Sequence, residues 1–517
     1  MKIARRPFAP ISTNVVWPMV TGSFGLRLWS PLLLLLAMLL LLDASTISAF
    51  PAATAFLTTH MPKRSQGTPN TAPSQLYAYK PVVVVGKIIV DEYGDPFPDF
   101  DGDHSEKSKA EDQGDPAPPK TVTIGGGGPQ AAFGALAALA VWDGYFKDHE
   151  IDTPKESLPP VVFVAPVGMD WISVDTEALK SCQGARSMVT IHKNKTMEMF
   201  DTSFDPASDE PIIQTYLVQD QTSTENSNNN QKISSNNGFF TPRIRLWHDE
   251  EQIVHWYALN DSFGPNGADG LWRNNPSAKD LVSILTKSKN TRQENGVVLH
   301  AIAETWTGAA GGQLDFLPLV QDKNLLQNHL SFVGIEPVAS GESVTQEDAA
   351  CAANVLHTCC NAIARSADSS CIDTVFWCPD RDLDNVLQIH DLYKDKASES
   401  TGAADSDHQS IGLTVAIRDG PRGSLIRNRT SATMIPAASL RTKNGAPLDP
   451  TGAGNAYSGS MTALLGNGIP TTIAACISSG VGAVVCEHEG LPPPGDWTKT
   501  LDRIASAARE VESKLKG

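Results

Sequence analysis

Apolar residues in this chain occur in short uninterrupted runs rather than in alternation with polar ones. The first is "PVVVVGKIIVDEY" (81–93), in which β-branched residues dominate. A continuous apolar run bounded by polar residues is typical of a strand buried on both faces of a sheet. The same pattern predicts further strands at 161–167, 296–303, 330–337, 374–379 and 412–418.

Alanine-rich stretches of helical character separate several of these runs. They include "QAAFGALAALAVW" (130–142) and "DAACAANVLHTCCNAIA" (348–364). Alternating strand and helix patterns favour a parallel sheet covered on both faces. The sequence therefore predicts an α/β fold, a three-layer sandwich around a mostly parallel central sheet. Three polar segments interrupt the pattern, and we expect loops, lid or disorder there: 95–119, 223–238 and 394–409.

The first eighty residues differ from the rest of the chain. Basic residues precede the apolar run "PLLLLLAMLLLL" (31–42), which is short for a membrane span. This order, followed by the small residues "STISA" (45–49), indicates a signal peptide over 1–49. A membrane anchor is the alternative interpretation.

The segment that follows has transit-peptide composition. Residues 50–78 are rich in Thr, Ser and Pro and contain no Asp or Glu. The junction "ISAFPA", with Phe50 just after the presumed cut, resembles the two-part plastid targeting signal of algae with complex plastids. We therefore expect a plastid (chloroplast stroma) destination and no membrane anchor after processing. Secretion is the alternative, and three N-x-[ST] sequons are compatible with it: Asn194, Asn260 and Asn428.

Composition and charge exclude some classes of function. The 517 residues are 41% hydrophobic and 19% charged, as in ordinary globular proteins, and the net charge is −17. Duplex nucleic acids are bound through basic patches, so this acidic chain is not expected to bind nucleic acid directly. Eight cysteines are too few for a disulfide scaffold.

Two stretches imitate metal sites without completing one. "DFDGD" (99–103) begins like a calcium loop, but His104 stands where the loop needs glycine and Ala110 where it needs glutamate. Five cysteines lie within 351–378, yet no CxxC pair occurs and His357 is the single histidine among them. Zinc sites bring paired ligands at short spacing, so reduced, structural thiols are the preferred interpretation.

Candidate chemistry is concentrated in "LDPTGAGNAYSG" (448–459). Gly452 and Gly454 allow a tight turn, and apolar residues then recur at helical spacing up to Gly466. A glycine turn that enters a helix exposes unpaired N–H groups at the positive end of the helix dipole, which suits an anion. The alternative is a helix cap packed on the sheet.

A second glycine cluster, "TIGGGGPQAAFGALAAL" (123–139), also leads into a helix. Four consecutive glycines are costly to order, which suggests close backbone approach to a ligand. No P-loop motif is present, so P-loop phosphate chemistry is not expected. We expect the two clusters, 125–128 and 452–455, to meet at one cleft.

Several segments, in this order, resemble the ribokinase, or pfkB, family of carbohydrate kinases. "VVVVGKIIVDEY" is similar to the first strand of that family, "IGGGGPQAA" to its first signature and "VAIRDGPRGSLI" to the strand–turn–strand before the active site. "LDPTGAGNAYSGSMTALL" is similar to the second signature, and "CISSGVGAVVCEHEGLP" to the helix after it. The resemblance covers residues 79–495, implies a ribokinase-like fold with a small β lid, and places the kinase domain at 79–517.

The resemblance implies a substrate pocket. Asp91 matches the acid that binds substrate hydroxyls, and Gly125, Gly126 and Gly128 match glycines that line the sugar pocket. Gln130 stands where many members have asparagine, and its amide can still donate to and accept from a hydroxyl. The implied substrate is a small sugar-like molecule, and lids in this family can pair into homodimers.

The resemblance also implies a nucleotide site for ATP with Mg²⁺. The turn Gly452, Ala453 and Gly454 matches the anion hole that holds the γ-phosphoryl group. The implied nucleotide-binding residues are Gly420, Gly423, Thr451 and Gly454.

Two departures from the family pattern bear on catalysis. Asn455 occupies the position of the catalytic base, and an amide cannot take the proton of the attacking hydroxyl. General-base assistance is worth about 10²–10⁴-fold. Asp449, six residues upstream, could replace it only if the loop folds differently. The N-x-x-E element of the family is also missing; its place offers tentative outer-shell metal partners, Asp380, Asp382 and Asp384.

Two functions remain open from the sequence. The first is ATP-dependent phosphorylation of a hydroxyl on a sugar-like molecule, slowed by Asn455. A eukaryotic branch of the family that carries G-A-G-N in place of G-A-G-D is similar in this respect, and the segment 241–261 also resembles its middle region. The second is a non-catalytic pseudokinase that uses the pocket for binding or assembly in the plastid. Trp247, Trp256 and Tyr257 are expected to be core residues.

Overall fold

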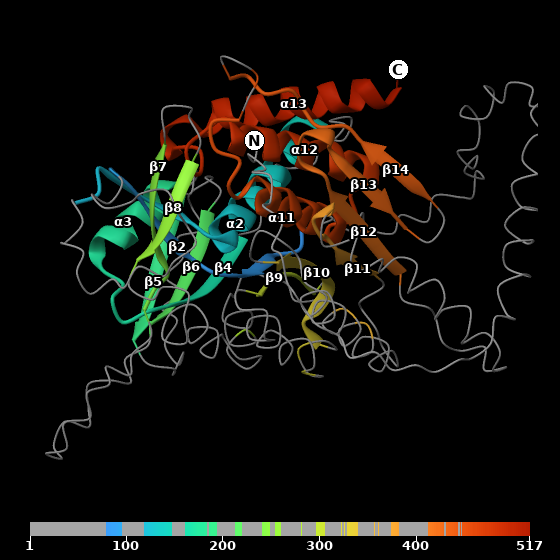
Figure 1. Cartoon of the computed structure of the whole chain (residues 1–517). Helices are drawn as coiled ribbons and strands as arrows, with labels where there is room; N and C mark the ends of the chain where they lie inside the picture. Colours follow the sequence, from blue (N-terminus) through green and yellow to red (C-terminus); the bar gives the residue numbers. More distant parts are fainter. Residues whose placement is uncertain are drawn as a thin grey trace, which may run out of the picture. The chain divides into compact units, whose positions relative to one another are not determined.

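A ten-stranded sheet and a separate four-stranded sheet organise the molecule (Figure 1). The computed structural model describes residues 79–95, 118–146, 161–182, 186–193, 212–219, 240–248, 254–259, 296–305, 328–339, 374–381, 412–428, 431–442, 447–516 and the single positions 281, 322, 325, 356, 360 and 445. The two predicted targeting segments and most of the three polar segments lie outside these residues.

The large sheet is mostly parallel, which confirms the α/β class. Its strand order is β14-β13-β12-β11-β10-β9-β1-β4-β6-β5. All neighbours from β12 to β5 are parallel, and β13 and β14 add an antiparallel edge. The strands are β1 (Val82–Val85), β4 (Val161–Val167), β5 (Arg186–Lys193), β6 (Ile212–Gln219), β9 (Val297–Thr305), β10 (Leu330–Ala339), β11 (Thr374–Trp377), β12 (Gly412–Arg418), β13 (Ser424–Arg427) and β14 (Ala432–Ile435).

The first apolar run forms two strands in different sheets rather than the single strand that its composition predicts. β1 ends at Val85 and β2 (Ile89–Tyr93) joins the small sheet, whose order is β3-β2-β7-β8. The break follows Gly86, where a Cβ would lie 2.8 Å from the Cα of Gly128. The backbone therefore passes too close to the second glycine cluster to continue as one straight strand.

The small sheet corresponds to the expected β lid. It comprises β2, β3 (Thr121–Gly125), β7 (Arg243–His248) and β8 (Val254–Leu259), with β7 and β8 paired as an antiparallel hairpin. Trp247 in β7 is buried, as expected of a core residue. The side chains of Trp256 and Tyr257 lie outside the described part of the chain.

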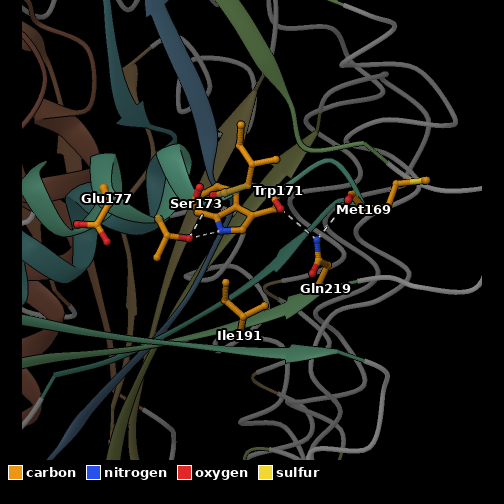
Figure 2. A pocket seen from close by; sticks show the side chains of 8 residues that line it. Met169, Trp171, Ser173, Glu177, Ile191 and Gln219 are labelled. Atoms are coloured by element: carbon orange, nitrogen blue, oxygen red, sulfur yellow. Dashed lines mark hydrogen bonds between the residues drawn. The ribbon is translucent and has the colours of Figure 1, made fainter.

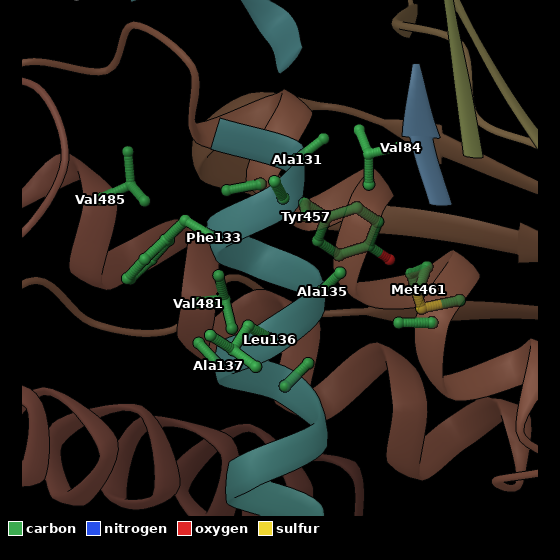
Figure 3. Packing of buried hydrophobic residues seen from close by; sticks show 14 of the residues in the cluster. Val84, Ala131, Phe133, Ala135, Leu136, Ala137, Tyr457, Met461, Val481 and Val485 are labelled. Carbon is green, nitrogen blue, oxygen red and sulfur yellow. The ribbon is translucent and has the colours of Figure 1, made fainter. Parts of the chain in front are cut away.

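Four described helices pack together beside the large sheet. They are α2 (Gly127–Val141), α11 (Ala453–Gly466), α12 (Thr471–Cys486) and α13 (Trp497–Lys516), with α2 in direct contact with α11, α12 and α13. Every residue of α2 is buried. Figure 3 places Phe133, Leu136 and the alanines of α2 among Tyr457, Met461, Val481 and Val485 of α11 and α12. The helix predicted at 130–142 is thereby confirmed, and so is the one ending at Gly466.

Shorter elements complete the described part. They are α3 (Ser173–Cys182), the π-helical turn Trp142–Phe146 and the 3₁₀ turns Gly420–Arg422 and Pro494–Asp496. The predicted helix at 348–364 lies almost wholly outside the described residues. Within them, no helix is long and apolar enough to cross a membrane.

Candidate functional site

The turn before α11 presents free amides at the start of a helix. Gly452 caps the helix with φ 80°, a left-handed conformation that glycine adopts readily. Ala453 N–H donates to the carbonyl of Pro450 and Ala456 N–H to that of Gly452. Between them, the amides of Gly454 and Asn455 have no acceptor among the described residues, and the first turn carries no acidic side chain. This geometry suits a phosphate or another anion.

The two glycine segments meet, as the sequence led us to expect. A Cβ at Gly452 would overlap the side chain of Gln130 on α2. Further along the same helix pair, a Cβ at Gly134 would overlap the carbonyl of Ala456, and one at Gly459 the carbonyl of Ala131. Small residues therefore let α2 and α11 lie backbone to backbone, which fixes the Gly452 turn beside Gln130.

The acid expected to bind hydroxyls, Asp91, lies on β2, close enough to Asp449 in the turn before α11 to sense its charge. It is 5% exposed on β2, and the missing side chain of Gly125 on the neighbouring strand β3 makes room for its carboxylate. Burial, followed by the negative charge of Asp449, raises the pKa of Asp91 well above its usual value. The Asp91 carboxylate has no hydrogen-bond partner within the part of the chain that the structure describes.

Gln130 is the second buried polar group without a full set of partners. Its side chain is 1% exposed, and its Oε1 accepts no hydrogen bond from the described residues. Native proteins rarely leave buried polar atoms unpaired, so each case calls for a reason. A hydroxyl-bearing ligand between Asp91 and the Gly452 turn would supply partners to both side chains.

Gly126 and Gly128 are packed closely against other residues of the chain rather than facing open space. A Cβ at Gly126 would lie 2.8 Å from the carbonyl of Lys87, and one at Gly128 would overlap the ring of Phe163. Gly128 N–H also donates to the Lys87 carbonyl over 3.0 Å. The glycine cluster thus packs onto the β1–β2 turn, which is a sufficient physical reason for these two glycines without a ligand.

Asp449 is held in the turn rather than offered to a substrate. Its Oδ1 accepts from Thr451 N–H over 2.9 Å, and its Oδ2 accepts from the hydroxyl of Tyr93 over 3.2 Å. Burial and then the charge of Asp449 raise the pKa of Tyr93. Asp449 therefore links the β lid to the turn and does not stand at the place of Asn455.

The side chain at the base position enters a buried polar network that the sequence did not reveal. Asn455 Nδ2 donates to Glu336 Oε1 over 3.0 Å. Glu336, at the carboxyl half of β10, is fully buried and pairs with Arg418 Nη1 from β12. Arg418 Nη2 also pairs with Asp380 over 2.9 Å, and a Cβ at Gly454 would lie 2.6 Å from Arg418 Nη1.

His300 on β9 completes this network. Its Nδ1 lies 2.8 Å from Thr462 Oγ1, and its Nε2 lies 3.7 Å from Glu336 Oε2, beyond hydrogen-bonding distance. Burial alone would raise the pKa of Glu336, but the charge of Arg418 and then the contact with His300 outweigh it and leave the pKa lowered. The signal in the sequence was available: Glu336 and His300 are the charged or titratable residues that interrupt the apolar runs 330–337 and 296–303.

Two other residues predicted to bind the nucleotide, Gly420 and Gly423, lie in a turn whose backbone conformation itself favours glycine. Gly420 and Gly423 flank the 3₁₀ turn between β12 and β13 with φ 52° and 99°. Gly420 is exposed, and a Cβ at Gly423 would overlap the carbonyl of Ile435. Their contact with a nucleotide stays a prediction, as does that of Thr451.

The tentative metal partners do not assemble into a site. Asp380 is paired with Arg418, while Asp382 and Asp384 lie outside the described residues, as does the 99–103 segment. No cluster of three His, Cys, Asp or Glu side chains that could hold an ion occurs in the described ranges. Cysteines 360, 378, 476 and 486 are free thiols, and burial raises the pKa of Cys378 to about 12. The described residues therefore do not fit a protein-held Mg²⁺.

A separate cavity of about 500 Å³ lies where β4 and β6 end (Figure 2). Gln219 Nε2 donates to the carbonyls of Met169 and Trp171, and Trp171 Nε1 donates to Thr176 Oγ1. Ile172, half exposed, and Ile191 add apolar walls. No pattern in the sequence predicted this cavity.

Comparison with known proteins gives a consistent but weak likeness. No family model and no curated protein matches the chain. Solved structures that are similar to it include a nucleoside kinase of the ribokinase family from Methanocaldococcus jannaschii (14% identity, 82% of this chain and 99% of that chain covered, TM-score 0.40). A second is the Arabidopsis thaliana ribokinase complexed with ribose and ATP (12% identity, 82% of this chain and 99% of that chain covered, TM-score 0.39). A third is the ribokinase of Giardia lamblia (14% identity, 82% of this chain and 99% of that chain covered, TM-score 0.42). At these scores the likeness assigns neither a substrate nor an activity to this chain.

Proposed function

We propose that this chain transfers the γ-phosphoryl group of ATP to a hydroxyl of a sugar or sugar-like small molecule. The observation that carries the proposal is the junction of Gln130 with the Gly452 turn. It brings a helix start with free amides next to the buried side chain of Gln130, whose Oε1 has no partner among the described residues. Asp91, near Asp449 of the same turn, is a second buried polar side chain without a hydrogen bond to them. One end suits a phosphate and the other a polyhydroxylated acceptor.

The residues of the site would have separate roles in binding the two substrates. Asp91 and Gln130 would hold the acceptor hydroxyls, and the amides of Gly454 and Asn455 would hold the transferring phosphoryl group. The acceptor oxygen forms the new bond to phosphorus and releases its proton to a phosphate oxygen or to water, while the bond to the bridging oxygen breaks and ADP leaves with that electron pair. Phosphoryl transfer depends largely on positioning and charge stabilisation, so these groups can accelerate it without a strong base. Mg²⁺ would accompany the ATP phosphates, since the described residues supply no site for it.

A pseudokinase that binds ligands for regulation or assembly is the second candidate. It is favoured by Asn455, whose amide cannot accept the proton of the acceptor and is already bonded to Glu336. Both functions predict ATP binding, and they differ in turnover.

An ADP-production assay over a panel of sugars separates the two candidates. We expect slow turnover with one class of sugar, which Asn455→Ala should lower without abolishing it. Gly454→Val should reduce it by about 10²-fold or more, because the new side chain meets Arg418 and fills the anion position. Gly144→Val is the matched control, since a Cβ at Gly144 meets nothing within 4 Å. Absence of any ATP-induced stabilisation would contradict both candidates.

The plastid destination is a further part of the proposal. It rests on residues 1–78 and on Phe50 at the presumed processing junction. A fluorescent reporter fused to residues 1–78 should enter the plastid, and Phe50→Ala should divert it to the secretory route. Homodimerisation through the lid can be checked by light scattering, with and without ATP and sugar.

A further inference from the structure

Asn455 and Glu336 have complementary hydrogen-bonding capacity at the point where α11 meets β10. The amide of Asn455 donates through Nδ2 to Glu336 Oε1 over 3.0 Å, and Oδ1 has no partner among the described residues. Glu336 is fully buried, whereas Asn455 is partly exposed. The bond therefore joins a buried carboxylate to a partly exposed side chain in the first turn of α11.

Neighbouring groups keep Glu336 in its acceptor state. Arg418 Nη1 pairs with Oε1, and His300 Nε2 lies 3.7 Å from Oε2. Asp380 also forms an ion pair with Arg418, through Nη2. An ionised carboxylate accepts hydrogen bonds but cannot donate them. It can therefore bind only the NH₂ end of the Asn455 amide.

We propose that Glu336 is a positioning residue that orients the Asn455 amide, so that Oδ1 is presented as a hydrogen-bond acceptor to the hydroxyl awaiting phosphorylation. This inference rests on the proposed function. Asn455 then aligns the acceptor without removing its proton. The pair also explains why this chain carries asparagine at position 455: an aspartate there would bring two carboxylates to about the same 3.0 Å separation.

A reciprocal exchange tests the pair independently of turnover. Asn455→Asp sets two carboxylates against each other, and Glu336→Gln leaves the buried Arg418 without its carboxylate. We expect each to lower the thermal unfolding midpoint by roughly 5 °C. The double variant restores one carboxylate facing one amide with donor and acceptor exchanged, so it should recover at least half of the summed loss. Strictly additive losses would overturn the inference, because coupled residues must depart from additivity.

Asn428→Asp is the matched control for the added charge. Its Oδ1 accepts from Ser431 N–H over 2.8 Å and from Ser431 Oγ over 2.9 Å, and a carboxylate accepts equally well. We expect its midpoint to stay within about 1 °C of the wild type. A loss equal to that of Asn455→Asp would show that added charge alone is responsible, and would overturn the inference.

Turnover gives a second readout that a purely structural Glu336 would not move. In the double variant, residue 455 is a carboxylate at the position of the catalytic base, and residue 336 is a neutral amide that does not repel it. ADP formation should therefore rise about 10²-fold above wild type. Asn455→Asp alone should remain below the double variant; equal rates would overturn the inference. No turnover and no ATP-induced stabilisation in the wild type would remove the proposed function, while the thermal exchange would still report on the pair.

Discussion

The two sides of the candidate site differ in how far their buried polar groups are connected to one another. On the acceptor side, Gln130 Oε1 is buried and accepts no hydrogen bond from the described residues, and the side chain of Asp91, 5% exposed, makes none with them. On the phosphoryl side, Asn455, Glu336 and Arg418 form a connected network, in which, of the buried side-chain atoms, Glu336 Oε2 and Arg418 Nε alone lack a hydrogen-bond partner among the described residues. A buried polar group without a partner lowers the stability of a fold. A buried pair causes a large loss of stability when one of its partners is removed. The acceptor side is therefore arranged for a ligand, and the phosphoryl side for its own stability.

Removal of Arg418 should have the largest effect, because it breaks the connected network. Arg418→Met leaves Glu336 buried without its cation, and we expect a loss of about 3–5 kcal/mol in the free energy of unfolding. The Arg418 side chain is 10% exposed and that of Glu336 is 0% exposed. Chemical denaturation measures the loss.

Lys499→Met is the control for that experiment. Lys499 pairs with Asp496 over 2.7 Å at the surface, with side chains 80% and 54% exposed. Water solvates the remaining carboxylate there, so the expected loss is at most about 1 kcal/mol. Equal losses in the two variants would contradict the view that the buried network stabilises the phosphoryl side.

The junction between the two sides is tested by a pair of glycines with the same backbone conformation. Gly452 has φ 80° and Gly468 has φ 77°, so alanine at either position carries a similar strain of roughly 1 kcal/mol. A Cβ at Gly468 meets nothing within 4 Å, whereas one at Gly452 overlaps Gln130. Gly452→Ala should therefore cost about 1–3 kcal/mol more than Gly468→Ala.

Ligand binding should separate the same two variants. Gly452→Ala displaces both the anion turn and the Gln130 amide, so we expect it to lose the ATP-induced rise in unfolding midpoint. Gly468→Ala should keep that rise. If both variants keep it, the turn at Gly452 does not bind the nucleotide.

Local patterns in the sequence were sufficient for much of the fold and for the junction. The apolar runs located six strands of the large sheet, and the glycine clusters located the starts of α2 and α11. The split of 81–93 was not predictable, since it depends on the close approach of Gly86 to Gly128. The Glu336 network was also missed, because His300, Glu336 and Arg418 come from three strands whose order in the sheet is a long-range property. Their polar character within apolar runs marked them without indicating what they contact.

The last expected effect concerns Asp91, is smallest near pH 4, and separates stability from function. Because the pKa of Asp91 is raised in the folded protein, chiefly by burial and then by Asp449, its ionised form opposes folding. That penalty is absent below the unfolded pKa, near 3.8, and grows as pH rises through the folded pKa. Asp91→Asn removes the titration, so the variant should gain stability over wild type with rising pH, by at most about 1.4 kcal/mol per pH unit. Denaturant unfolding between pH 4 and pH 8 measures this gain, which should be accompanied by weaker sugar-induced stabilisation. A variant less stable than wild type at pH 8 would mean that the Asp91 carboxylate is satisfied within the fold, and that the acceptor side is not arranged for a ligand.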